Sequence, residues 1–104
     1  MPSTTKPNPA ACGRIVMTRA VADSIDYQLV KTALSRHFNG DWGTLSEDDA
    51  ALNTQTISTQ DGGRLMSSYH DLGDQPLWVI TDGYGNDPTD PDLCNTTVLL
   101  PSDY

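Results

Sequence analysis

The stretch Leu77-Trp-Val-Ile-Thr81 is the strongest strand signal in this chain of 104 residues, and it decides the fold. Its aromatic and β-branched residues suit the pleated surface of a β-sheet. Outward from it, residues 96–100 form a similar run that Pro101 ends, residues 64–70 alternate loosely, and residues 14–18 are short and β-prone. Strands that follow one another through turns predict a small antiparallel sheet of three or four strands.

Two helices are expected between the first and second strands. Apolar residues from Ile25 to Phe38 recur at helical spacing, and Gly40 supplies a helix stop. Ser46 begins a run that is similar to a capping box, which predicts a short second helix over about residues 47–55. One long and one short helix packed on one face of this sheet give an α+β fold. We expect one domain over residues 12–104, preceded by a flexible tail over residues 1–11.

The charge is uneven along the chain. The net charge is −8; residues 1–40 hold five basic and two acidic residues, and residues 41–104 hold one basic and twelve acidic residues. This balance disfavours direct binding to nucleic acid or to anionic membranes, and it favours a basic protein surface as partner. The carboxylates expected to contact that partner belong to Asp41, Glu47, Asp48, Asp49, Asp82, Asp87, Asp90 and Asp92.

The cysteines bear on the cellular location. The polar, proline-rich residues 1–9 do not resemble a signal peptide, and no apolar run is long enough to cross a membrane. We therefore expect a cytoplasmic protein in which Cys12 and Cys94 are reduced thiols. A Cys12–Cys94 disulfide is the less favoured alternative. Stability is expected to depend on neither a disulfide nor a metal.

The segment Gly40-Asp-Trp-Gly43 is the sharpest local motif. Glycines on both sides of Trp42 allow a tight corner between the two helices, and a tryptophan in such a corner commonly fills the core. We expect structural roles for Gly40, Trp42, Gly43 and Trp78, with exposure of Trp42 as a partner anchor as the alternative.

Four segments together resemble a family of small acidic proteins of phages, plasmids and other mobile elements. They are Arg36-His37 with residues 40–43, Arg64-Leu65 with Ser67 and Tyr69, residues 78–81, and residues 96–101 with Asp103-Tyr104. The resemblance implies a role in mobile-element biology, and with the charge it suggests an inhibitor of a host defence nuclease of the anti-CRISPR or anti-restriction type. Residues 83–95 depart from the family pattern as an insertion, which is a candidate for a function specific to this member.

Catalytic and metal-binding hypotheses are weaker. His37 and Asp41 could act as a general base with its partner, and a small enzyme or nucleotide-binding protein with a pocket around His37, Asp41 and Arg64 is the alternative function. Ser67, Ser68 and His70 lack the elbow motif of serine hydrolases. The cysteines and histidines do not have zinc-site spacing. The acidic loop offers oxygen ligands for calcium but does not match an EF-hand. We expect no cofactor, no metal and no enzymatic activity.

Overall fold

The α+β fold predicted from the sequence is confirmed. The computed structural model describes residues 14–87, 89–90 and 92–104, so the expected tail over residues 1–11 lies outside the described residues. The elements are β1 (Arg14–Met17), α1 (Arg19–Ser24), α2 (Tyr27–Phe38), α3 (Glu47–Thr59), β2 (Gly63–Tyr69), β3 (Leu77–Tyr84), β4 (Asn95–Leu99) and a 3₁₀ turn (Pro101–Asp103).

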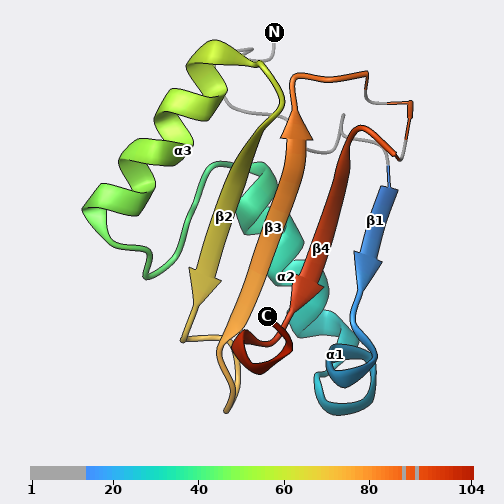
Figure 1. The fold of residues 1–104 in the computed structure, drawn as a ribbon. Coiled ribbons are helices and arrows are strands. Elements are labelled where there is room, and N and C mark those ends of the chain that lie inside the picture. Colours follow the sequence, from blue (N-terminus) through green and yellow to red (C-terminus); the bar gives the residue numbers. More distant parts are fainter. Residues whose placement is uncertain (1–13, 88, 91) are drawn as a thin grey trace, which may run out of the picture.

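The four described strands form one mixed sheet in the order β1-β4-β3-β2 (Figure 1). β2, β3 and β4 make the predicted antiparallel meander. β1 differs from the prediction, because it pairs with β4 in parallel, with Ile15 opposite Thr96. Parallel neighbours need a long connection, and the chain between β1 and β4 contains the helices and the other two strands.

The helices differ from the prediction in extent and in placement. The expected helix over residues 25–38 begins only at Tyr27, because Asp26 caps it by accepting a hydrogen bond from the Gln28 amide at 2.8 Å. A separate short helix, α1, precedes it. α3 is longer than predicted and ends where Gln60 adopts a left-handed backbone (φ 48°). Within the described residues, every helix is too short or too polar to cross a bilayer.

The main core lies between the sheet and the two helices α1 and α2. Figure 1 shows α2 crossing behind the strands, while α3 lies beside β2 and does not share that face. The buried core side chains are Val21, Val30, Ala33, Tyr69, Leu77, Val79, Val98 and Leu100. Residues of alternate parity, such as Met66, Trp78 and Thr97, project from the opposite, open face of the sheet.

Cys94 contradicts the expectation of a reduced thiol. It is fully buried just before β4, and its sulfur is disulfide-bonded. Cys12 lies outside the described residues. The sequence argument relied on the cellular compartment, which says nothing about where the fold brings a particular sulfur.

Candidate protein-binding surface

The outer edge of β2 is closed by groups of the same chain. The Asn53 side chain donates to the Met66 carbonyl at 2.7 Å and accepts from the Met66 amide at 3.0 Å. Two residues further on, the Ser68 amide donates to the Trp42 carbonyl at 3.1 Å and the Ser68 carbonyl accepts from the Thr44 amide at 2.7 Å. These bonds occupy backbone groups that an added strand would need, so a partner of this side must bind mainly through side chains.

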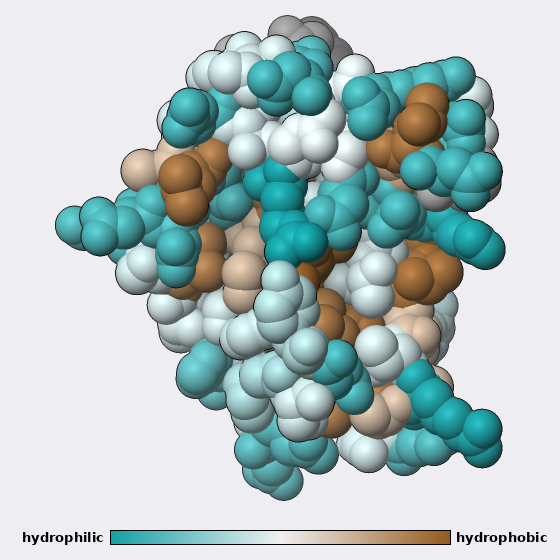
Figure 2. Space-filling view, viewed as in Figure 1, coloured by the Kyte–Doolittle hydropathy of each residue, from teal (hydrophilic) through white to brown (hydrophobic). Residues whose placement is uncertain are grey.

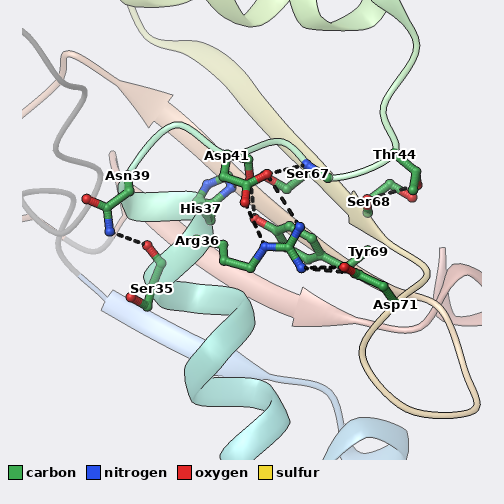
Figure 3. Close-up of polar contacts among 11 residues, drawn as sticks. Ser35, Arg36, His37, Asn39, Asp41, Thr44, Ser67, Ser68, Tyr69 and Asp71 are labelled. Carbon is green, nitrogen blue, oxygen red and sulfur yellow. Dashed lines mark hydrogen bonds and ion pairs between the residues drawn. The ribbon is translucent and has the colours of Figure 1, made fainter.

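The corner between α2 and α3 is held by Arg36 (Figure 3). Its guanidinium donates to Asp41 at 2.8 Å and to Asp71 at 2.9 Å, and it lies 4.5 Å from the centre of the Tyr69 ring. The Tyr69 hydroxyl donates to the Asp41 carbonyl at 2.6 Å. The hydrogen bond from Arg36 holds the pKa of Asp41 below its usual value. Asp41, predicted as a partner contact, is therefore largely compensated within the fold.

The corner glycines and Trp42 serve this packing. Gly40 and Gly43 both have left-handed φ angles, 80° and 72°. A Cβ on Gly43 would overlap the Ser68 carbonyl oxygen and approach the Tyr69 ring. Trp42 is partly buried and does not belong to the fully buried core; its ring meets His37 edge-on at 5.6 Å.

His37 is a buried polar residue and not an accessible base. Its Nδ1 lies 2.6 Å from the Ser67 hydroxyl, and its Nε2 lies 3.0 Å from the Thr81 hydroxyl, which continues to the Thr96 hydroxyl at 2.7 Å. Burial lowers the pKa of His37 to about 4, so the ring is neutral at pH 7. Four buried polar side chains satisfy one another in this network, and no substrate can reach it without opening the core.

The pocket hypothesized around His37, Asp41 and Arg64 is not assembled. His37 is enclosed in the core, Asp41 binds Arg36, and Arg64 extends over the open face of the sheet. There the Arg64 guanidinium donates to Asp82 at 2.9 Å and to the Tyr104 hydroxyl at 2.8 Å. The Tyr104 ring also packs edge-on against Trp78 at 5.7 Å, which gives Trp78 a packing role on the open face.

The loop between β3 and β4 uses two of its predicted contact residues for its own turns. The Asp87 carboxylate accepts from the amide and the hydroxyl of Thr89, at 2.9 and 2.7 Å, and the bond from that hydroxyl lowers the pKa of Asp87. The Asp90 carboxylate accepts from the Asp92 amide at 2.9 Å. In the part of the chain that the structure describes, no three His, Cys, Asp or Glu side chains gather to hold a metal.

Of the remaining predicted acids, Asp92 is exposed in the loop before β4, and the other three are exposed at α3. Glu47, Asp48 and Asp49 occupy its first turn, where the helix dipole favours negative charge, and Ser46 caps the helix through the Asp49 amide. None of the three is ion-paired with a cation of the described residues. Asp61, which sequence reasoning did not single out, follows the other end of α3 and is likewise exposed. In the sequence, only the position of Asp61 just after the end of this helix could have indicated that it is exposed.

A groove runs between α3 and the open face of β2. It consists of two adjoining hollows, of about 410 and 320 Å³, that share Asp49 and Met66. Leu52 and Thr56 line the larger hollow, and Asp61 and Arg64 also contact it. Figure 2 shows brown, hydrophobic surface among teal surface on the side that carries α3. The groove could not be predicted from the sequence. The few apolar residues of α3 indicated a weakly packed helix, but they did not indicate a binding site.

Comparisons with known protein families, curated proteins and solved structures found no match to this chain. The resemblance to acidic proteins of mobile elements therefore stays a prediction.

Proposed function

We propose that this protein is an acidic binding module that docks on a basic protein surface through α3 and its flanks. One observation carries the proposal: of fourteen acidic residues, only Asp23, Asp41, Asp71 and Asp82 pair with a cation of the described residues. The acids at both ends of α3 are among those left over. Their mutual repulsion is relieved when a basic partner binds, which favours association and steers it.

The charge density favours a protein-like mode of docking over full mimicry of DNA. The 13 residues of α3 span about 18 Å, over which duplex DNA would carry about ten phosphates. Four carboxylates, those of residues 47–49 and Asp61, flank that length. Together with the resemblance, the acidic surface supports the narrower proposal that the partner is a nucleic-acid-binding protein, such as a host defence nuclease whose basic surface it occupies.

Affinity capture from a bacterial lysate tests this function. We expect the immobilised protein to retain a basic nucleic-acid-binding protein at about 0.05 M salt and to release it at about 0.5 M, because the Debye length falls from roughly 14 to about 4 Å. The double variant Asp48→Asn/Asp49→Asn should lose the partner. The matched control Asp23→Asn/Asp74→Asn changes the net charge equally, away from α3, and should keep it. Capture that is insensitive to salt, or lost equally in both variants, would contradict the proposal.

The sequence favours a cytoplasmic site of action, and the disulfide bond of Cys94 has to be reconciled with that location. Disulfides are rare in a reducing cytoplasm, so the protein would have to remain folded after reduction. Loss of a native disulfide typically costs about 2–4 kcal/mol. The disulfide of Cys94 therefore replaces the sequence-based expectation of disulfide-independent stability, and we expect reductant to lower the melting temperature by about 8 °C or more. Thermal melts with and without reductant check this. A reduced protein that is unfolded at about 37 °C would rule out the cytoplasm.

A further inference from the structure

We propose that the groove between α3 and β2 receives an extended segment of the basic partner, with an aliphatic side chain in the larger hollow and a lysine or arginine toward each end of that hollow. This inference rests on the proposed function and specifies which part of the partner is recognised.

The walls of the groove select an apolar side chain. Leu52 is 59% exposed on the α3 side, and Met66 lies on the floor shared by both hollows. The hydrogen bonds between Asn53 and Met66 attach α3 to β2, so the exposed Leu52 side chain stays available to a partner. Burial of an aliphatic side chain between Leu52 and Met66 removes apolar surface of both molecules from water, which favours binding.

The two ends of the larger hollow select positive charge. Asp49 lies in the first turn of α3 and Asp61 just beyond its last, and neither is paired with a cation of the described residues. Two residues with basic side chains line the hollows: Asp82 compensates Arg64, and His70 lines only the smaller hollow. The part of α3 from Asp49 to its end at Thr59 is about 15 Å long, which an extended chain spans with about five residues.

The closed edge of β2 determines how this segment binds. Outward-facing backbone groups of Met66 and Ser68 are already hydrogen-bonded to Asn53, Trp42 and Thr44. A partner therefore cannot add to β2 as a further strand without breaking those bonds. Recognition by side chains alone explains why both an apolar contact and charge contacts are needed.

A pair of synthetic peptides tests the groove. Each carries a fluorescent label and two lysines at either end of a five-residue stretch; one peptide has leucine at the centre of that stretch and the other has glutamine. Fluorescence anisotropy at about 0.05 M salt measures both affinities. We expect the leucine peptide to bind about tenfold more tightly to the parent protein.

The protein variants separate apolar recognition from charge. Leu52→Gln should weaken the leucine peptide about tenfold and leave the glutamine peptide unchanged. Leu93→Gln is the matched control, because Leu93 is also exposed (49%) but lies in the loop between β3 and β4, and it should change neither affinity. Both residues are exposed, so unchanged melting temperatures are expected to accompany these results.

The outcomes distinguish this inference from the function on which it rests. Equal affinities for the two peptides, or an unaffected Leu52→Gln variant, would overturn the groove inference while leaving charge-driven docking in place. If neither peptide binds with Kd below about 1 mM, and the capture experiment also shows no salt-sensitive partner, both proposals fail.

Discussion

The acidic residues at the end of α2 are ion-paired, whereas those at the start of α3 are not. At the end of α2, Arg36 holds Asp41 and Asp71 and stacks on Tyr69, so these charges stabilise the corner. At the start of α3, the acids at positions 47–49 are exposed to solvent, and none of them forms an ion pair with a cation of the described residues. The difference separates acids that hold the fold from acids that remain available to a partner. The net charge of the chain gives no hint of this division.

The largest effect is expected from Gly43→Ala, which attacks the closed corner. A side chain there would be strained at a φ of 72° and would overlap backbone of β2, so we expect a loss of more than about 3 kcal/mol. Chemical denaturation measures it. Gly73→Ala is the matched control, because its φ is 83° but its Cβ would meet only the end of the Leu29 side chain. Equal losses in both variants would show that the approach of the corner to β2 is unimportant.

Trp42→Ala should have the next largest effect. Trp42 is partly buried against His37, so we expect a loss of about 2–3 kcal/mol, below the roughly 3–5 kcal/mol of a fully buried tryptophan. A thermal melt checks this, and capture of the basic partner should persist because the α3 acids are untouched. A variant that melts like the parent but loses the partner would move Trp42 from the corner to the interface.

Acid should weaken the corner through His37. Because burial lowers its folded pKa to about 4 from about 6.5, the unfolded chain binds the proton more readily between these values. Stability therefore falls as the pH decreases through that window, by about 2 kcal/mol between about pH 7 and about pH 5. Urea denaturation at both pH values measures the loss, and exposed His70 provides the control, since His70→Gln should retain it. A stability that does not change over this interval would contradict the buried, neutral state of His37.

The smallest stability change is expected on the open side. Asp48→Asn/Asp49→Asn should cost a few tenths of a kcal/mol to about 1 kcal/mol, because only the interaction with the helix dipole is weakened. The same variant should abolish partner capture. Asp41→Asn is the comparison at the corner: it weakens the ion pair with Arg36 but should leave capture intact. If Asp41→Asn also abolishes capture, the division between the two regions is wrong.

The sequence predicted the local elements well and the long-range pairing less well. β-branched and aromatic residues located β3 and β4, and helical spacing located α2. The parallel pairing of β1 was missed because direction depends on the path of the whole chain, which a four-residue strand does not encode. The break before α2 was missed because Ile25 fits the helical spacing, although Asp26 is a good cap.

The candidate site was predictable only in its charge. The acids of the first turn of α3 were expected as contact residues, and they are exposed. Leu52 and Met66 were not expected, because their roles depend on α3 lying beside β2 instead of on the core face. His37 looked reactive beside Asp41 in sequence, but the helix turns it inward toward Ser67 and Thr81.

The Asn53 side chain also limits how copies of this chain can assemble. Since it fills the hydrogen-bonding positions of Met66, β2 cannot template another strand, and growth of the sheet in that direction is blocked. The Ser68 amide and carbonyl are likewise bonded to Trp42 and Thr44, so a strand could be added to β2 only after these bonds are broken. The amide of Asn53, together with the backbone of Trp42 and Thr44, therefore protects this edge of the sheet against growth into a fibril.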